Sequence, residues 1–318
     1  VRLGGQAWFW ALMMGLSMLI GGTLAMLIAT TRVVMPYDES MAGLTRQQLA
    51  EVNERLLSFM THDRVTLAGT MLAVGILYSA LAWCGIRRGV HWAFVTVVAS
   101  ALAGFVSFFS FLGFGYFDPF HAFVTAILFQ FLVLTVHSAL PQQQRQPPPE
   151  LWNDWRWRAN QWGQLLFVVH GAILIVAGLV ISGIGMTSVF VPEDLEFMNV
   201  CSAELVDAHP QLVPLVAHDR ATFGGMLIAC GVATLLPALW GFQRGQAWLW
   251  RALMAAGNLA YCSTILVHWA VGYHSLKHLL PAYGGWALLW AGGAASYAFL
   301  VASDPELEAE WTRRSERR

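Results

Sequence analysis

Charged residues are scarce in this sequence. Asp, Glu, Lys and Arg together make up 12% of its 318 residues, whereas soluble domains carry about 25%. Apolar residues account for 57% of the chain, and its mean hydropathy is +0.55. This deficit of charge excludes an ordinary pair of soluble domains and favours a chain embedded in a lipid bilayer.

Two further features are scarce, basic surface and cysteine, and each scarcity excludes a class of function. The formal net charge is −1, and no basic stripe or arm stands clear of the apolar segments, so nucleic-acid binding is excluded. Cysteines are also few: Cys84, Cys230 and Cys262 fall inside apolar runs, and Cys201 stands alone in a loop. That pattern excludes a disulfide framework, and no HExxH motif or cysteine pair indicates a zinc site.

Long apolar runs, in contrast, are abundant. A hydrocarbon core about 30 Å thick is crossed by roughly 20 residues of helix. Eight stretches are long enough: 8–29, 65–86, 91–113, 119–138, 163–186, 221–242, 248–270 and 281–301. The first is longer than the apolar region of a signal peptide, and no small-residue cleavage site ends it, so we expect a retained helix. The sequence therefore predicts an all-α integral membrane protein with eight transmembrane helices.

Arginine predicts the orientation of these helices. The connections that must share one side of the membrane all carry arginine: 85–89, 241–245, 152–162 and the tail 311–318. Because arginine is enriched in cytoplasmic loops, we expect both termini in the cytoplasm and the chain in a bacterial inner (cytoplasmic) membrane, with lipid as its main partner. The loops 30–62 and 187–218 then face outward.

These outer loops have structure of their own. Residues 44–60 have apolar residues at helical spacing after Thr45 and Gln48, which are spaced as a capping box, and this predicts one amphipathic surface helix. In the second loop, Pro210 and Pro214 predict a shorter or kinked helix.

The chain repeats itself at an offset of 156 residues. His62, Asp63 and Arg64 recur as His218, Asp219 and Arg220, and further matches fall on Pro, Asp, Thr, Gly and Trp. After a slip of one residue, Gly115-Tyr116 with His121 matches Gly272-Tyr273 with His278. Matches on polar residues and glycine indicate duplication rather than shared hydrophobicity. We therefore predict two parallel-repeat four-helix bundles, with an N-terminal repeat at 1–140, a cytoplasmic linker at 141–162, a C-terminal repeat at 163–302 and a cytoplasmic polar tail at 303–318.

Paired histidines are the candidate site. His62 opens the second span and His121 follows Asp118 and Pro119, an expected N-cap and first helical residue, in the fourth, so both lie near the outer face of one bundle. His218 and His278 repeat this arrangement in the other half. Facing imidazoles in a bundle suit axial ligation of haem iron, and Arg64 and Arg220 suit its propionates.

Other interpretations of these residues stay open. The histidines can instead be interfacial residues, with Asp and Arg as salt-bridged anchors at headgroup level. His274 is an alternative ligand. We expect structural positions for the remaining histidines, which lack a partner at the repeat offset or lie at boundaries and in loops: His91, His137, His170, His209 and His268.

Eight spans in two parallel halves, with a histidine at the outer start of spans two, four, six and eight, resemble the haem A synthase family. The histidine spacings of 59 and 60 residues, the arginine after each His-Asp pair and the sizeable outer loops carry the resemblance. In that family one half binds haem b and the other holds haem O, whose methyl group is oxidised to a formyl group. The resemblance implies that His218 and His278 ligate a haem, and that His62 and His121 flank the substrate site.

The sequence departs from the family at three points. Phe59 stands where the family has a glutamate, Asp63 stands where it has arginine directly after the histidine, and the cysteine pair found in many members is missing from the first outer loop. The resemblance therefore implies haem binding more than oxidation chemistry.

Two functions follow as hypotheses. The first is a haem-dependent membrane oxidoreductase, whose catalytic residues the sequence does not identify. The second is a non-catalytic subunit or assembly partner of a larger respiratory or photosynthetic membrane complex, in which the His-Asp-Arg motifs are structural. A transporter is disfavoured, because no span has the midplane Gly/Pro interruption that marks transporter substrate sites.

Overall fold

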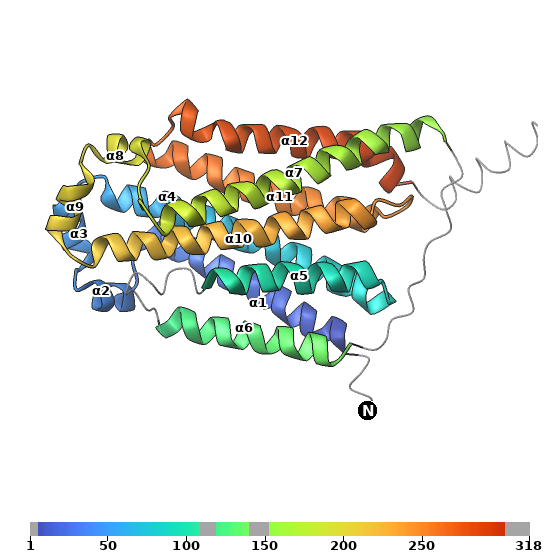
Figure 1. Ribbon diagram of the computed structural model, residues 1–318, viewed down its shortest axis with the longest axis horizontal. Helices are drawn as coiled ribbons and strands as arrows, with labels where there is room; N and C mark the ends of the chain where they lie inside the picture. Colours follow the sequence, from blue (N-terminus) through green and yellow to red (C-terminus); the bar gives the residue numbers. More distant parts are fainter. Residues whose placement is uncertain (1–5, 109–118, 140–152, 303–318) are drawn as a thin grey trace, which may run out of the picture.

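The computed structural model describes residues 6–108, 119–139 and 153–302, and every regular element among them is a helix (Figure 1). The long helices are α1 (Ala7–Thr31), α4 (Leu56–Ala80), α5 (His91–Phe108), α6 (Pro119–His137), α7 (Trp155–Gly185), α10 (Leu212–Trp240), α11 (Ala247–Val271) and α12 (Leu276–Leu300). The short ones are α2 (Pro36–Ala42), α3 (Arg46–Val52), α8 (Pro192–Met198) and α9 (Ser202–Ala208), and a π turn (Leu81–Gly85) and a 3-10 turn (Ile86–Arg88) prolong α4.

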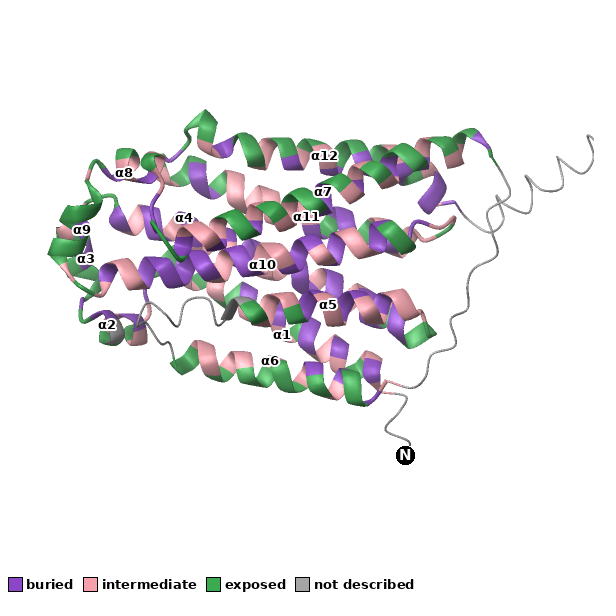
Figure 2. Cartoon of the chain, in the orientation of Figure 1, coloured by how far each residue is buried: buried purple, intermediate pink, exposed green. Residues whose placement is uncertain are grey.

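Five helices of the described chain are long and apolar enough to cross a bilayer: α1, α4 with its continuation to Arg88, α6, α7 and α10. The predicted all-helical class and the predicted membrane-protein class are therefore confirmed. Burial follows the same division (Figure 2): α4 and α10 are buried over much of their length, whereas α6 presents mostly exposed apolar side chains, as expected for a surface in lipid.

Three long helices begin eight or nine residues earlier than hydropathy predicts, at Leu56, Trp155 and Leu212 instead of residues 65, 163 and 221. His62 and His218 therefore lie about two turns inside α4 and α10 and do not open these helices. Pro214 does not interrupt α10, because it is the third residue of the helix, where the missing N–H has no partner to lose. The predicted linker is also partly helical, since α7 starts within it.

The first outer loop contains two helices instead of the single predicted one. Thr45 caps α3 and forms the predicted capping box with Gln48. The helix then stops at Asn53, whose backbone is extended and whose side-chain oxygen accepts a hydrogen bond from the Arg55 backbone N–H. The side-chain amide of Asn53 donates to the Met198 carbonyl at 2.9 Å, so this break joins the two outer loops. α6 begins at Pro119, as predicted, whereas the expected N-cap Asp118 and the Gly115-Tyr116 pair lie outside the described residues.

Glycines set the closest helix pairs. α1 packs on α4, and α7 packs on α10. A Cβ atom at Gly178 of α7 would lie 2.5 Å from the Gly224 carbonyl oxygen of α10, and one at Gly22 of α1 would lie 2.9 Å from Leu72 of α4. Because lipid supplies no hydrophobic drive for association, such close backbone approach is what holds membrane helices together.

The two halves of the chain are interleaved and do not form two separate bundles. α5 packs against α10 of the other half, α11 packs against α4, and α4 and α10 contact each other at the centre. The short helices α2, α3, α8 and α9 gather at one end of the helices (Figure 1). Interleaving places residues of both halves around one site at that end.

Candidate metal centre and lipophilic cavity

The structure pairs the four predicted histidines across the halves. His121 Nδ1 lies 2.9 Å from His218 Nε2, and the ring centroids of His62 and His278 lie 6.0 Å apart. The expected pairs within each half, His62 with His121 and His218 with His278, are wrong. The physical reason is the packing of α11 against α4 and of α5 against α10, which places the third long helix of each half against the other half, whereas α6 stays on α1 and α12 stays on α7.

A third histidine joins His62 and His278. One ring nitrogen each of His62, His268 and His278 lies within 4.8 Å of those of the other two, and we call these residues the histidine cluster. The side chains of His62 and His268 are buried, and His278 is half-buried. Their ring centroids are 4.8 to 6.0 Å apart, so the three imidazoles converge on one small volume.

Hydrogen bonds at Nδ1 fix the tautomer of each ring. Nδ1 of His62 contacts the Phe59 carbonyl, and Nδ1 of His268 lies 2.7 Å from the Thr264 carbonyl. Because a carbonyl only accepts, both Nδ1 atoms carry the proton. The Tyr273 hydroxyl donates to Asp194 at 2.8 Å and therefore accepts from Nδ1 of His278, 3.2 Å away. Each imidazole thus presents Nε2 as a lone pair, as in a metal-binding histidine whose other nitrogen is held by a second group.

Two of the three Nε2 atoms face no hydrogen-bond donor among the described residues. Nε2 of His268 is buried and has no hydrogen-bond partner, which is rare for a buried polar atom. Nε2 of His62 faces Asp63 Oδ1 at 3.3 Å, so two acceptors oppose each other. A cation beside these atoms would satisfy both.

Beside the cluster lies a buried network of four aspartates and two arginines. Arg64 pairs with Asp38 at 2.7 Å and with Asp219 at 2.8 Å. Arg220 pairs with Asp194 at 2.8 Å and with Asp63 at 3.3 Å. Each arginine therefore links an aspartate of its own half to one of the other half, and this explains why the His-Asp-Arg motif occurs twice.

The network carries more negative than positive charge. Four carboxylates against two guanidinium groups leave two negative charges within these six residues. Asp63 and Asp194, the two carboxylates that adjoin the histidine cluster, share the single guanidinium group of Arg220. Excess negative charge is costly in a buried site, so a cation at the cluster would balance it. Burial, and next the Asp194 carboxylate, raise the pKa of Tyr273, so its hydroxyl keeps its proton at neutral pH and continues to donate to Asp194.

The same arginines hold two strained turns. Val33 and Val189 have φ angles of 67° and 63°, in the left-handed region that a β-branched residue rarely adopts. Nη1 of Arg64 donates to the Val33 carbonyl at 2.7 Å, and Nη1 of Arg220 donates to the Val189 carbonyl at 2.8 Å. Strain of this kind persists only where the surroundings enforce it.

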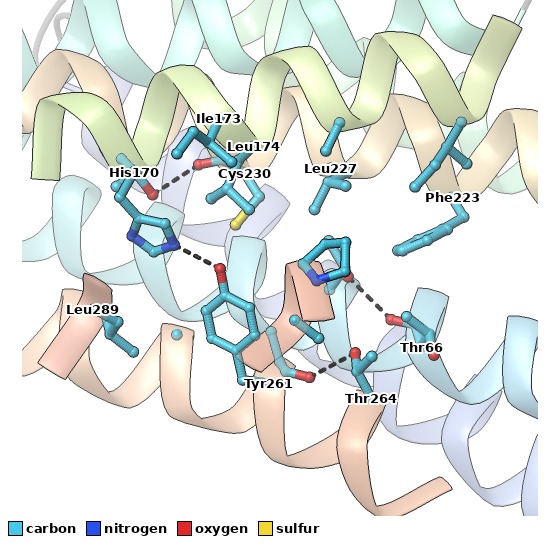
Figure 3. Close-up of a pocket in the computed structure, with 18 of the residues that line it drawn as sticks. Thr66, His170, Ile173, Leu174, Phe223, Leu227, Cys230, Tyr261, Thr264 and Leu289 are labelled. Carbon is cyan, nitrogen blue, oxygen red and sulfur yellow. Dashed lines mark hydrogen bonds between the residues drawn. The ribbon is translucent and has the colours of Figure 1, made fainter. Parts of the chain in front are cut away.

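A cavity of about 320 Å³ extends from the histidine cluster into the helices. Its walls come from α4, α7, α10, α11 and α12 and are mostly apolar, and His170 and Tyr261 form a polar pair within it (Figure 3). A second cavity of about 120 Å³, lined by α1, α4, α5, α6 and α10, includes His121.

The predicted site residues thus have different surroundings. His62 and His278 belong to the cluster, whereas His121 and His218 contact each other. Arg64 and Arg220 each bind two aspartate carboxylates, whereas the sequence predicted a haem propionate as the partner of each arginine. His274 is exposed and stacks on Trp269, outside the cluster.

His268 and His170 are the site residues that sequence reasoning missed. Neither has a histidine at the repeat offset, and we therefore expected structural positions for both. The spacing of His268 could have indicated its place in the site. It lies ten residues before His278, and the turn between two apolar spans separates the two histidines. Residues so placed face each other when the two helices pack as an antiparallel pair.

Comparison of the chain with protein-family models, with curated proteins and with solved structures finds no match. Axial ligands of a haem lie on opposite faces of a flat ring, but the rings of His268 and Tyr273 lie within 5.7 Å of each other and contact both His62 and His278. As placed, the histidine cluster fits a single metal ion, and a haem between His62 and His278 requires His268 and Tyr273 to move aside.

Proposed function

We propose that the chain is an integral membrane metalloprotein of the oxidoreductase class, which holds one transition-metal ion through Nε2 of His62, His268 and His278. The observation that carries the proposal is Nε2 of His268, a buried lone pair without a partner in a cluster of three imidazoles. The excess negative charge of Asp63 and Asp194 over their shared partner Arg220 supports a cation at this place.

The ligand set indicates the class of metal. Neutral imidazoles suit zinc, copper, iron and nickel, whereas magnesium and calcium prefer oxygen ligands. Three protein ligands leave a coordination position open, which is the pattern of catalytic rather than structural sites. All three histidines line the cavity, so a molecule in the cavity would reach that open position.

Haem iron is the second candidate. The resemblance to haem A synthases and the 6.0 Å separation of the His62 and His278 rings support it, as does the apolar cavity beside them. The two candidates differ in absorbance, because haem gives a Soret band and a bare ion does not. If the purified protein binds neither a metal ion nor haem, the alternative function is favoured, that of a non-catalytic subunit beside other membrane subunits.

We further propose eight spans, with α5, α11 and α12 crossing the membrane beside the five helices named above, in two parallel repeats. The pairing of α1 with α4 and of α7 with α10 supports the repeat, as do the matched bonds of Arg64 and Arg220. The arginine-bearing connections support cytoplasmic termini in a bacterial inner membrane.

Metal content tests the proposal. Purified in detergent and reloaded with zinc, copper or iron, the protein should hold about one ion per chain, and His268→Ala should lower the affinity by at least roughly tenfold, because a ligand is lost. His274→Ala is the matched control, since it removes an exposed histidine six residues away, and should leave metal content unchanged.

Three results would decide against the metal ion. Reloaded protein without stoichiometric metal excludes the site, and His268→Ala protein that keeps its metal excludes the ligand assignment. A Soret band that survives in His268→Ala and is lost in His62→Ala and His278→Ala would replace the bare ion by haem.

A further inference from the structure

The cavity beside the histidine cluster is long and follows the helices. Its lining on α4 runs from His62 to Leu77, and its lining on α11 runs from His268 back to Leu253, a difference of 15 positions in each case. At a rise of about 1.5 Å per residue, both stretches are about 22 Å long. Each has a histidine of the cluster at one end and a buried leucine at the other. The cavity is therefore elongated, with one end at the proposed metal site.

Contacts between the helices keep the two stretches level with each other. A Cβ atom at Gly69 of α4 would lie 2.7 Å from the Ser263 side chain of α11. A Cβ atom at Gly85, farther along the chain, would lie 3.8 Å from the Trp248 ring, at the start of α11. The two helices are thus antiparallel and stay together from the cluster to beyond Leu77.

Between these ends, one face of each helix lines the cavity. On α11 the lining residues include Leu253, Ala256, Ala260, Thr264 and His268, which are three or four positions apart. This is the spacing of side chains on a single helix face. α7 and α10 line the cavity at the same spacing. The lining is therefore continuous from the cluster to the far end.

The two ends of the cavity differ in polarity. Asp63 and Arg220 are the charged residues among the described lining, and they pair with each other at 3.3 Å beside the cluster. The far end is formed by Leu77, Leu253 and Leu289, which are at most 3% exposed. This lining matches a molecule with one polar head and one apolar tail.

Polar side chains along the wall are held by the protein itself. Thr70, Thr234 and Thr264 each donate their hydroxyl to the carbonyl one turn earlier in the same helix, at 2.9 to 3.0 Å. The Tyr261 hydroxyl and Nε2 of His170 lie 2.6 Å apart (Figure 3). These hydroxyl groups therefore do not require a polar group in the tail of a ligand.

Volume and length together select the shape of the ligand. The volume of about 320 Å³ is roughly twice that of an apolar cavity of about 150 Å³ that binds benzene, a ligand of six carbons. By that scale the cavity holds about 13 carbons. At about 1.2 Å per bond, an extended chain of about 13 carbons with a head oxygen spans about 16 Å. A fused ring system of equal carbon number is shorter and wider, and would leave part of the length empty.

The head of the ligand is uncharged. Arg220 already binds the carboxylates of Asp63 and Asp194 and donates to the Val189 carbonyl. The described lining has no other cationic side chain that would pair with an anionic head. A neutral oxygen atom remains as the group that suits this end.

We propose that the cavity binds one unbranched lipid chain, a long-chain alcohol, with its hydroxyl oxygen beside the histidine cluster and its methyl end among Leu77, Leu253 and Leu289. The inference rests on the proposed function for the role of the head, because the hydroxyl oxygen would take the coordination position that the three histidines leave open. The fit of the tail depends on the length of the cavity and does not require the metal.

Photochemical cross-linking to the purified, metal-loaded protein in nanodiscs tests the inference. Two tetradecanol probes are used, one with a diazirine near the methyl end and one with a diazirine near the hydroxyl. The first should label peptides that contain Leu77, Leu253 or Leu289, and the second should label peptides that contain the cluster histidines. Unlabelled tetradecanol should compete, whereas octanol and anthracene methanol should compete poorly.

A blocked cavity provides the matched variants. Ala260 lines the cavity eight positions from His268, at a depth of about 12 Å. Ala260→Phe should weaken competition by tetradecanol by at least roughly tenfold, because several methylene groups lose their burial, and the best-binding alcohol should become shorter. Ala260→Leu should shift the chain-length preference less. Ala255→Phe, on the exposed side of the same helix, should leave the preference unchanged.

The outcomes separate the two proposals. Length-dependent binding to protein that holds no metal supports the cavity ligand and overturns the metal centre, whereas metal without length-dependent binding overturns the cavity ligand alone. Labelling of the same peptides by both probes overturns it, as does an unchanged chain-length preference in folded Ala260→Phe and Ala260→Leu proteins. Equal competition by anthracene methanol also overturns it, because the cavity would then not select an extended chain.

Discussion

At the scale of the residue, Arg220 joins three parts of the molecule. It pairs with Asp194 of the outer loop and with Asp63 of α4, and it donates to the carbonyl of the strained Val189. Removal of such a side chain leaves two carboxylates buried without a positive partner. The repeated His-Asp-Arg motif therefore connects the two halves through ion pairs, and it also lies beside the candidate site.

Arg220→Gln should strongly destabilise the fold. We expect a loss of about 3–5 kcal/mol in the free energy of unfolding, the usual effect of breaking a buried ion pair from one side, measured by denaturation in mild detergent. The exposed Arg251 of α11 provides the control, since Arg251→Gln should change stability by less than about 0.5 kcal/mol. Addition of Asp63→Asn to Arg220→Gln should recover part of the loss; if both arginine variants are equally stable, the network does not contribute to the fold.

The sequence predicts two members of the histidine cluster and misses the third. His62 and His278 were singled out because each recurs at the repeat offset, whereas Phe111 and Leu112 stand at the positions that would match His268. A search for repeated residues finds what both halves share. It cannot find a residue that makes one half different, and such a residue is what a single specialised site requires.

At the scale of the element, glycine positions decide how closely helices pack. Gly178 of α7 touches the backbone of α10, and its Cβ atom would lie 2.5 Å from the Gly224 carbonyl oxygen and 2.8 Å from the Ile228 nitrogen. Backbone atoms cannot move aside as a flexible side chain can. An added methyl group therefore has to separate the two helices.

Gly178→Ala should destabilise the protein by about 1–3 kcal/mol through overpacking. Gly183→Ala in the same helix meets nothing within 4 Å and should be neutral or stabilising by up to about 1 kcal/mol, because alanine favours helix. Unfolding of both variants in detergent gives the comparison. Equal stability of the two would show that the close contact between α7 and α10 is not maintained in the bilayer-like environment.

Helix boundaries were predictable only in part. Hydropathy located the apolar centre of α4 and α10 but not their first two turns. These turns are also largely apolar, but the His-Asp-Arg triplets at 62–64 and 218–220 separate them from the rest of each helix. The capping box at Thr45 was predictable, because it is written within four residues. The break at Asn53 was not, because it depends on a hydrogen bond to Met198 in the other outer loop.

At the scale of the whole molecule, the interleaved halves explain why histidines pair across the repeat. Sequence periodicity predicts the helices and their duplication, but the contact of α11 with α4 is tertiary and has no local signature. Of the four predicted histidines, His62 and His278 lie together in the histidine cluster, although the repeat assigns them to different halves. This arrangement also makes the site depend on both halves of one chain.

The proposed orientation can be tested with cysteines. Cys201 is exposed at the end that carries α8 and α9 and should react with a membrane-impermeant maleimide in intact cells. In a Cys201→Ser background, Arg158→Cys at the opposite end, where α7 begins, should react only after permeabilisation. Labelling of the Arg158→Cys protein in intact cells would reverse the orientation.

X-ray absorption at the edge of the bound metal tests the central claim most directly. For the metal-loaded protein we predict a first shell that contains about three imidazole nitrogens at roughly 2.0–2.1 Å, reduced by one in His268→Ala and unchanged in His274→Ala. A first shell of sulfur or carboxylate oxygen alone, the multiple scattering of a porphyrin, or the same imidazole number in His268→Ala would contradict a metal ion held by His62, His268 and His278.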